Sequence, residues 1–328
     1  MPSTRRLFLT GLCALPAWPL AGRHAHAAYP DRPIHFVVPF AAGGNADIVG
    51  RVIADVVGGV LQQPIIIDNR PGAGGAVGAV FAAHAPGDGY TMMVASNGPM
   101  TVNPFVNAKL GYDPFKDFVP IALTSYVPHV LIVSETSEVK TIADLITKSK
   151  SRSVNIGTSG IGSATHMTLA RLEHATGAKI THVPYRSGGQ LLPDVISGAI
   201  DGALTELSTV LQLHKAKQAR IIGAASGARP TLAPDIATFE ESGVMGFRAQ
   251  SYIGIVAPTQ TPGDIVERVA RAIMESLAPG KPAVATLIGQ GSTIALPQEM
   301  TPAGFKAFLK RDYNEMAEAA EIAGIVPS

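Results

Sequence analysis

Residues 34–60, IHFVVPFAAGGNADIVGRVIADVVGGV, contain the signals of a strand, a glycine-rich loop and a helix, in that order. Residues 34–38 are short, largely apolar and show little alternation, which is typical of a strand buried on both faces. After a pair of glycines, Asn45 is a candidate N-cap, and from residue 48 apolar side chains recur with the 3.6-residue period of a helix. The stretch therefore predicts one strand–loop–helix unit of an α/β fold.

The same alternation of strand and helix continues along the chain. Short β-branched runs predict further strands, and amphipathic stretches predict helices between them. The expected strands cover residues 64–67, 91–95, 130–133, 154–156, 180–183, 220–224 and 251–256. The expected helices cover residues 75–85, 142–150, 164–175, 264–277, 283–288 and 302–323. Because the last three helices follow without a new strand, we expect this tail to pack on the first α/β layer.

The length of the chain favours two domains. Removing a leader of 27 residues from the 328 would leave 301, which is ample for two packed cores. The strand–helix pattern restarts near residue 129, and the chain passes between the two parts near residues 127–133 and 250–256. We therefore expect one lobe from residues 28–128 plus 252–328 and a second from residues 129–251, each with a parallel, doubly wound sheet.

The first 27 residues have the features of a cleaved signal peptide. The twin arginines Arg5 and Arg6 precede an apolar run over residues 12–20, and Ala25-His26-Ala27 is a small-x-small cleavage signature. Two prolines interrupt the run, and it is shorter than the ~20 apolar residues that span a bilayer. This argues against the alternative of a membrane anchor. We expect a periplasmic protein, exported by the twin-arginine or the general secretory route.

The composition after cleavage excludes several classes of function. The segment 1–27 contains Arg5, Arg6 and Arg23 and no acidic residue, so 23 basic side chains remain against 25 acidic ones. This balance argues against a nucleic acid or an anionic membrane as the partner. The single cysteine also lies in this segment, so the mature chain has no disulfide and no thiolate metal ligand. We expect neither a metal nor a cofactor.

Three glycine-rich loops lie where predicted strands lead into helices. They cover residues 40–47, 157–163 and 185–189. Each places backbone N–H groups at the positive end of a helix, where small residues permit close approach. Such ends, divided between two lobes, suit a small anion held between them; the alternative is that the glycines only make tight turns. Arg186 lies in the third loop, either as a bidentate carboxylate partner or as a solvated side chain.

No named catalytic or metal motif is complete. Residues 72–78 lack the third glycine of a dinucleotide fingerprint, and Ile161 replaces the last glycine of a hydrolase elbow. No two histidines after residue 28 have the three-to-five-residue spacing of a helical metal pair. His166 has either a capping or ligand-site role or a plain surface role. An enzyme would need a base beside a loop serine, and no motif places one there.

The sequence alone does not assign a role to each of three acidic residues. Asp47 fits a first-turn carboxylate favoured by the helix dipole better than a catalytic acid. Asp201 and Glu206 flank a short apolar stretch and are either paired carboxylates or residues with a hinge or salt-bridge role. We assign no catalytic residue.

The ordered set of loops makes the chain similar to a known family. The matching stretches are Pro39-Phe40-Ala41-Ala42-Gly43-Gly44 with Asp47, Asn69-Arg70-Pro71-Gly72-Ala73-Gly74-Gly75, Asp88-Gly89-Tyr90-Thr91, Asn103-Pro104, Tyr112-Asp113-Pro114, Asp117-Phe118-Val119-Pro120-Ile121, Gly160-Ile161-Gly162-Ser163 with His166, and Val183-Pro184-Tyr185 with Gly188. The chain resembles the substrate-binding proteins of tripartite tricarboxylate transporters, the Bug family. The resemblance implies a two-lobed periplasmic binding protein of the type II, Venus-flytrap class, with a hinge that the chain crosses twice.

The resemblance also implies a function and a set of contacts. Such proteins close on a small carboxylate, hold it with amides, hydroxyls and water, and present it to a membrane permease. The implied contacts are Ala41, Ala42, Gly43 and Gly44 in the first lobe and Thr158, Ser159, Ser163, Ser187 and Gly188 in the second. Phe40, Asn97, Arg186 and Glu206 complete the expected site.

The sequence departs from the family pattern near two of these residues. Ser96-Asn97-Gly98-Pro99 and Thr205-Glu206-Leu207 differ from what relatives usually carry on the variable side of the pocket. The identity of the acid therefore stays open. We expect a monomeric binding protein rather than an enzyme. The alternative function is a ligand sensor whose closed form docks on a histidine-kinase ectodomain.

Overall fold

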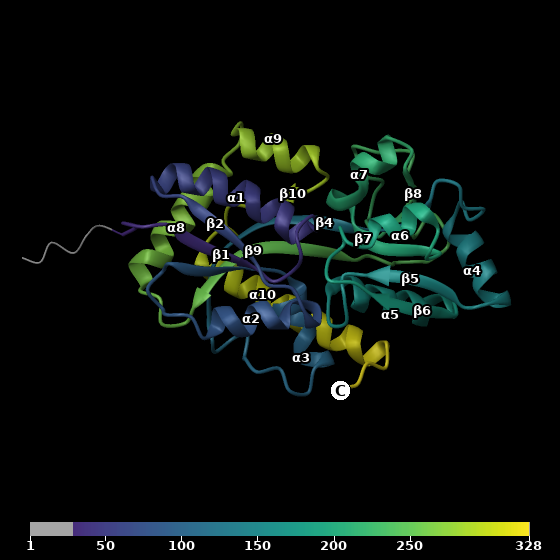
Figure 1. Ribbon diagram of the computed structural model, residues 1–328, viewed down its shortest axis with the longest axis horizontal. Helices are drawn as coiled ribbons and strands as arrows, with labels where there is room; N and C mark the ends of the chain where they lie inside the picture. The colour runs from purple at the N-terminus through teal and green to yellow at the C-terminus, as the bar shows by residue number, and fades with distance from the viewer. Residues whose placement is uncertain (1–28, 328) are drawn as a thin grey trace, which may run out of the picture.

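Two α/β lobes lie side by side in the computed structural model, which describes residues 29–327 (Figure 1). The predicted signal peptide falls outside these residues. In the first lobe, β1 (Ile34–Val38), β2 (Ile65–Asn69) and β3 (Thr91–Ala95) pair in parallel in the order β2-β1-β3. β9 (Gln250–Pro258) then pairs antiparallel with β3. The strand–loop–helix unit at residues 34–60 is confirmed, because β1 leads directly into α1 (Asn45–Leu61).

The second lobe is built on four further strands. They are β5 (Val154–Thr158), β6 (Ile180–Pro184), β7 (Gly202–Glu206) and β8 (Ala219–Ala224). β5 lies between β6 and β7 and is parallel to both. β7 and β8 both pair antiparallel with the end of β4.

The 17-residue strand β4 (Phe118–Ser134) joins the two lobes. Residues 118–128 pair antiparallel with β9, and residues 129–134 pair with β7 and β8. The two predicted sheets are therefore parts of one ten-stranded mixed sheet that share a strand. The two expected crossings of the chain fall in β4 and β9, which are hydrogen-bonded to each other.

Helices cover both faces of the sheet. Figure 1 shows α1 on one face of the first lobe and α2 and α10 on the other. The remaining bounds are α2 (Ala76–Ala83), α3 (Asn103–Val106), α4 (Ile142–Ser151), α5 (Ala164–Thr176), α6 (Leu192–Ser197), α7 (Leu207–Lys215), α8 (Gly263–Ser276), α9 (Pro282–Gly289) and α10 (Pro302–Ile322). Across residues 29–327, no helix combines the length and the apolar character that crossing a membrane requires.

Each lobe has its own hydrophobic core. One cluster takes side chains from residues 34–123 and 252–309, including Phe36 and Phe305. Two further clusters take side chains only from residues 127–249. The first core is therefore discontinuous in sequence, whereas the second is continuous. The boundaries at residues 128/129 and 251/252 remain our proposal for the division into lobes.

The C-terminal tail differs from the sequence prediction in two ways. A short strand, β10 (Thr293–Ile294), pairs antiparallel with β4 where only helices were predicted. Two residues are too few to produce a strand-like alternation, so the sequence carries no signal for it. In addition, the end of α10 packs Ala319 and Ala320 in one apolar cluster with Met167 of α5. The tail therefore contacts both lobes, not the first lobe alone.

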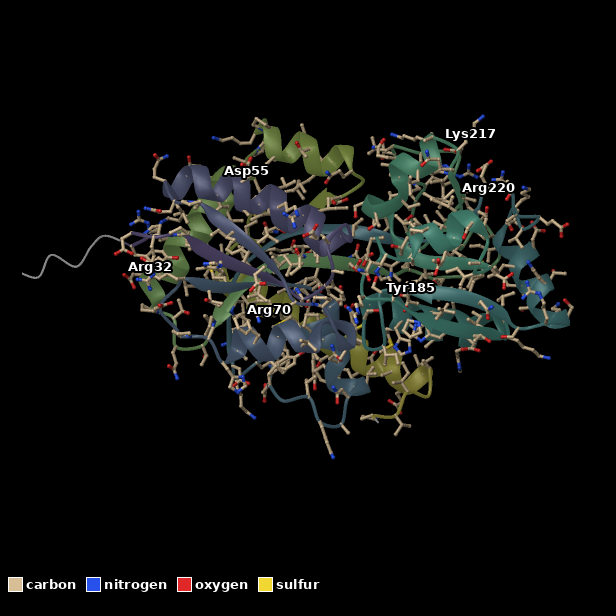
Figure 2. The ribbon with its side chains drawn as sticks, viewed as in Figure 1. Arg32, Asp55, Arg70, Tyr185, Lys217 and Arg220 are labelled. Atoms are coloured by element: carbon tan, nitrogen blue, oxygen red, sulfur yellow. The ribbon has the colours of Figure 1, made fainter. Side chains whose placement is uncertain are left out.

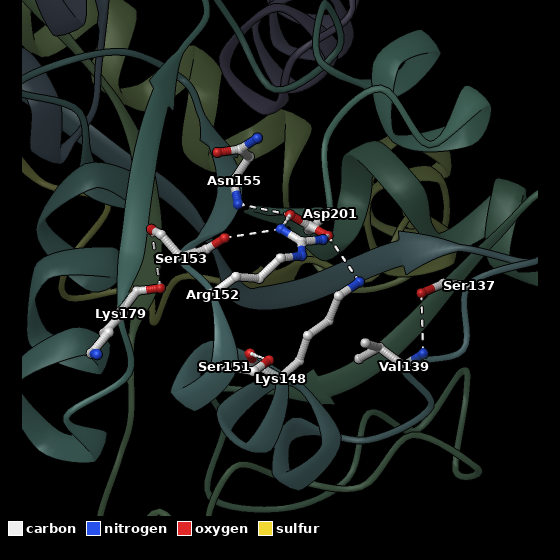
Figure 3. Close-up of polar contacts among 9 residues, drawn as sticks. All are labelled: Ser137, Val139, Lys148, Ser151, Arg152, Ser153, Asn155, Lys179 and Asp201. Carbon is white, nitrogen blue, oxygen red and sulfur yellow. Dashed lines mark hydrogen bonds and ion pairs between the residues drawn. The ribbon is translucent and has the colours of Figure 1, made fainter.

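Asp201 ties together the start of β7, α4 and β5 (Figure 3). Its carboxylate forms ion pairs with Lys148 (2.9 Å) and Arg152 and accepts a hydrogen bond from the Asn155 N–H (2.9 Å). Burial opposes ionisation of Asp201, but these three partners outweigh it and lower the pKa to about 2. Of the two roles left open for Asp201, the structure selects the salt bridge.

Replacing Asp201 by Asn should lower the free energy of unfolding by about 1–2 kcal/mol at pH 7, since both cations are partly exposed and gain water in exchange. The folded-state pKa lies below the unfolded value of about 3.9. The carboxylate therefore stabilises the fold above pH 4, and this stabilisation is lost as the pH falls from 4 towards 2. Urea unfolding of both proteins should show their difference shrinking by about half between pH 6 and pH 3. A difference independent of pH would contradict this assignment.

Candidate functional site

A small cavity of about 20 Å³ lies between the two lobes. Small and hydroxyl-bearing residues dominate its wall. The lining residues are Phe40, Gly44, Asn45, Ala46, Ser96, Ser159, Ser163, Ala164, Ser187, Gly188, Glu206, Ser251 and Ile253. Neither lysine nor arginine is among these described lining residues. Any anion in the cavity must therefore be stabilised by hydrogen-bond donors and helix ends rather than by an ion pair.

The first lobe contributes the N-terminus of α1. The prediction of Asn45 as N-cap is wrong: Gly44 is the N-cap, with extended backbone, and Asn45 is the first helical residue. The Asn45 side chain instead accepts a hydrogen bond from Ser208 of the second lobe (2.8 Å). Gly44, Asn45 and Ala46 line the cavity. The first turn of a 17-residue helix, whose N–H groups have no intrahelical acceptor, thus borders the cavity.

The carboxylate of Asp47 holds the loop in front of α1. It accepts hydrogen bonds from Gly43 N–H (3.0 Å), Arg51 Nε (3.0 Å) and Asn69 Nδ2 (2.9 Å). Asn69 also donates to the carbonyl of Phe40 (3.0 Å). Burial opposes ionisation of Asp47, but the hydrogen bonds from Arg51, Gly43 and Asn69 outweigh it and lower the pKa. Asp47 therefore positions the loop, as expected of a first-turn carboxylate.

The second lobe contributes the N-terminus of α5. Ser163 is its N-cap, because the Ser163 hydroxyl accepts a hydrogen bond from His166 N–H (3.1 Å). Ser159 N–H donates to Thr165 Oγ1 (3.0 Å), which fixes the preceding loop. Ser159, Ser163 and Ala164 line the cavity. Two helix N-termini from opposite lobes therefore border the same small space, and their dipoles favour a negative charge there.

The third glycine-rich loop brings the lobes into contact. Ala41 N–H donates to the carbonyl of Arg186 across the gap (3.2 Å). A Cβ atom on Gly189 would lie 2.6 Å from the carbonyl oxygen of Gly43, closer than packed atoms approach. The backbones of the two lobes can meet only because position 189 has no side chain. The lobes are thus closed on each other in this structure.

One carboxyl group also borders the cavity. Glu206, 8% exposed, precedes α7, and its Oε1 is hydrogen-bonded to Ser251 Oγ (3.1 Å). Ser251 Oγ is bonded in turn to His129 Nε2 (2.8 Å), and His129 Nδ1 to Thr168 Oγ1 (2.8 Å). Burial raises the pKa of Glu206 and lowers the pKa of His129 to about 3. The network therefore connects the cavity to a neutral, fully buried histidine.

The Ser251–His129 pair has the spacing of a nucleophile and its base. With a pKa of about 3, however, His129 is a very weak base at neutral pH. Ser251 also shares its hydroxyl with Glu206. Sequence analysis missed the pair because 122 residues separate its members and no motif connects them. The arrangement supplies a hydrogen-bond network rather than an activated serine.

The structure brings seven of the predicted contact residues to the cavity. They are Phe40, Gly44, Ser159, Ser163, Ser187, Gly188 and Glu206. The other predicted loop residues of the first lobe, Ala41, Ala42 and Gly43, adjoin Gly44 without lining the cavity. Thr158 also lies behind the wall, where its hydroxyl is hydrogen-bonded to His182 Nε2 (2.6 Å).

Arg186 lies at a neighbouring pocket rather than in the cavity. This pocket of about 190 Å³ shares Phe40 and Ser159 with the cavity and is also lined by Tyr185. Figure 2 shows Tyr185 near the junction of the lobes, whereas Lys217 lies on the outside of the molecule. The Arg186 side chain is exposed, so of its two predicted roles the structure favours the solvated one.

Asn97 is turned away from the cavity, contrary to its predicted role. Its Nδ2 donates to the carboxylate of Asp312 (3.2 Å), and its Oδ1 accepts from Tyr252 N–H (3.1 Å). The neighbouring Ser96 lines the cavity instead. Ser96 follows β3 directly, and ligand contacts gather at the carboxyl ends of parallel strands, so the sequence indicates this region but does not choose between Ser96 and Asn97.

His166 has the capping role left open for it. Its Nδ1 accepts a hydrogen bond from Gly162 N–H (3.3 Å), and its ring stacks on His182 with centroids 4.6 Å apart. Burial lowers the pKa of His166. Within the part of the chain that the structure describes, no group of three or more His, Cys, Asp or Glu side chains could hold a metal ion.

Comparison with known proteins identifies relatives that match about nine-tenths of the chain. BugT of Bordetella pertussis is 30% identical over 304 residues, which cover 91% of this chain and 93% of BugT. An R. palustris protein solved with adipate has a TM-score of 0.87 and 29% identity, and the match covers 92% of this chain and all of that one. MatC from Rhodopseudomonas palustris, solved with bound malate, has a TM-score of 0.84 and 28% identity, with 89% and 99% of the two chains covered.

The family match agrees with these relatives. Residues 49–296 match the model of the tripartite tricarboxylate transporter family receptor, and this range spans α1 to β10. The fold, the glycine loops and the relatives therefore agree on one identity. The chain belongs to the tripartite tricarboxylate transporter receptor family, which includes the Bug proteins and whose members are periplasmic solute-binding proteins.

Proposed function

We propose that the protein captures a small organic carboxylate between its lobes and delivers it to a tripartite tricarboxylate-type permease. The observation that carries the proposal is the pair of helix N-termini, from α1 and α5, on one cavity, among whose lining residues within 29–327 there is no cationic side chain. Backbone N–H groups and the hydroxyls of Ser159, Ser163 and Ser187 would offset the loss of water from the carboxylate.

Closure of the lobes is the mechanical step of this proposal. A ligand shifts the balance between open and closed forms only if it binds one of them more tightly. In the closed form the cavity takes Gly44 from one lobe and Ser163 and Gly188 from the other, so a carboxylate gains its full set of contacts only there. The closed surface would then be what the permease recognises.

The relatives support this chemistry. Two of them were solved with the dicarboxylates adipate and malate, and the family takes its name from tricarboxylate transporters. We infer that the protein is exported to the periplasm through its N-terminal segment and acts as a monomeric receptor. No observation favours the alternative of docking on a histidine kinase.

Thermal shift of the mature protein against mono-, di- and tricarboxylates and their amides tests the proposed ligand class. A matching acid at 100 times its Kd should add about 2.7 kcal/mol to the free energy of unfolding, whereas its amide should add nothing. A shift caused only by neutral compounds would refute carboxylate binding. Uptake by proteoliposomes containing the permease, with and without this protein, would then test delivery.

A further inference from the structure

We infer that Glu206 selects carboxylates that carry a hydrogen-bond donor, a hydroxyl or an ammonium group, close to the carboxylate bound by the amides. The inference rests on the proposed function of the same cavity and names the class of acid that the cavity takes. It follows from the direction of the hydrogen bonds behind Glu206 and from the position of its second oxygen.

The hydrogen-bond network behind Glu206 occupies one of its two oxygens. The Ser251 hydroxyl donates to Glu206 Oε1 (3.1 Å). Behind this bond, Ser251 Oγ lies 2.8 Å from His129 Nε2, and His129 Nδ1 lies 2.8 Å from Thr168 Oγ1. Oε1 of Glu206 is therefore an acceptor that already has its donor.

The second oxygen of Glu206 is therefore an acceptor. With Oε1 engaged by Ser251, Oε2 is the oxygen left to accept from a ligand. The Thr205 hydroxyl donates to Oε2 at 3.4 Å, a long contact. Oε2 therefore presents a lone pair with which a donor on the ligand can pair.

This oxygen lies beside the amides proposed to hold the ligand. A Cβ atom placed on Gly188 would lie 3.2 Å from Glu206 Oε2 and 3.6 Å from Ser159 Oγ. A Cβ atom placed on Gly44, at the N-terminus of α1, would lie 3.4 Å from Gly188 N. The Gly188 backbone thus lies between the helix end and Glu206. A carboxylate held at this backbone has Oε2 within reach of a substituent on its neighbouring carbon.

The acceptor discriminates by repulsion as well as by attraction. An acid with a hydroxyl or ammonium group near its carboxylate gives Oε2 a donor. An acid without one leaves Oε2 buried with its long Thr205 contact and places the lone pairs of Oε2 next to the oxygens of the ligand's carboxylate. Sites built to hydrogen-bond such a group reject the analogue that lacks it far more strongly than apolar pockets reject a missing methylene.

Isothermal titration of the mature protein with matched acids tests the inference. The probes share a skeleton and differ at one carbon: propionate, lactate and alanine; succinate, malate and aspartate; glutarate, 2-hydroxyglutarate and glutamate. For the skeleton that fits, the hydroxy or amino acid should bind at least about tenfold more tightly than its unsubstituted parent. Which of the two binds more tightly separates hydroxy acids from amino acids as the source of the donor.

Two variants and one control localise the effect to Glu206. Glu206→Leu removes the acceptor. In Glu206→Gln the carbonyl oxygen keeps the bond from Ser251, so the amide NH2, a donor, takes the place of Oε2. Both variants should reduce the ratio of affinities towards one. Glu138→Gln, which changes an exposed carboxyl between β4 and α4 that does not line the cavity, should leave the ratio unchanged. Equal affinities for substituted and unsubstituted acids in the wild type would overturn the inference alone. Failure of every acid to bind would overturn the proposed function and the inference with it.

Discussion

Gly189→Ala should weaken binding of the native ligand by about 10- to 100-fold, the equivalent of about 1–3 kcal/mol of overpacking. The new Cβ atom would lie 2.6 Å from the carbonyl oxygen and 3.2 Å from the Cα of Gly43 on the other lobe. Gly189 does not have the positive φ that favours glycine, so alanine fits the backbone of the separated lobe. The substitution therefore opposes closure without removing a lining residue of the cavity.

Titration calorimetry and small-angle scattering would separate closure from folding. We expect the ligand-free variant to unfold at about the wild-type temperature, while ligand no longer reduces its radius of gyration. Gly59→Ala is the matched control, because a Cβ atom there has no neighbour within 4 Å and should leave affinity unchanged. Wild-type affinity in Gly189→Ala would mean that the ligand-bound state does not bring these two loops together.

Asp47→Ala should lower the free energy of unfolding by about 2–3 kcal/mol at pH 7 and weaken ligand binding as well. The loss of the carboxylate leaves Gly43 N–H and one Asn69 contact without their acceptor and frees Arg51. The loop that ends at Gly44 then loses its fixed conformation, and the binding contacts of the α1 terminus lose their alignment. Urea unfolding measures the first effect and calorimetry measures the second.

The pH dependence of this effect identifies its cause. Since the pKa of Asp47 is lowered in the folded state, its charge stabilises the protein above the unfolded pKa of about 3.9, and this contribution is lost as the pH falls below that value. Wild type and Asp47→Ala should therefore converge at low pH. Asp55→Ala is the control, because Asp55 lies exposed on the same helix (Figure 2). A loss of stability in Asp55→Ala as large as in Asp47→Ala would show that the effect is not specific to the loop.

The repeating units of the fold were predictable because their signals are local. Apolar runs of about five residues and helical periodicity located β1, α1 and most later elements. The long strand β4 was predicted only over residues 130–133, because Pro120 and Pro128 argue against a continuous strand. The structure accommodates this stretch with shifts in register near Pro120 and Leu123. In this part of β4, pairing with the distant strand β9 outweighs the local preference of the prolines against a strand.

The parts of the candidate site that lie at the N-termini of helices were predictable from the sequence. Gly44, Ser163 and Gly188 belong to loops with clear turn signals, and all three line the cavity. Ser251 and His129 lie in strands that appear ordinary in sequence, so only the pairing of β4 with β9 and β7 brings them to Glu206. Which of two adjacent residues, Ser96 or Asn97, faces the cavity depends on the backbone turn after β3, which composition does not determine.

The split of the first hydrophobic core also sets the order in which the chain can be buried during synthesis. All residues of the second lobe's two clusters, between 127 and 249, have been made before Ile253 of the first core appears. The first core can be completed only after Ile273 and Phe305 have been synthesised as well. The contacts between residues 34–123 and residues 252–309 close a long loop of chain. We expect them to form late, after the sequence-continuous second lobe has folded. Residues 34–123, although made before the second lobe, are thus the last to bury their apolar side chains, and they remain accessible to chaperones until residue 305 has been made.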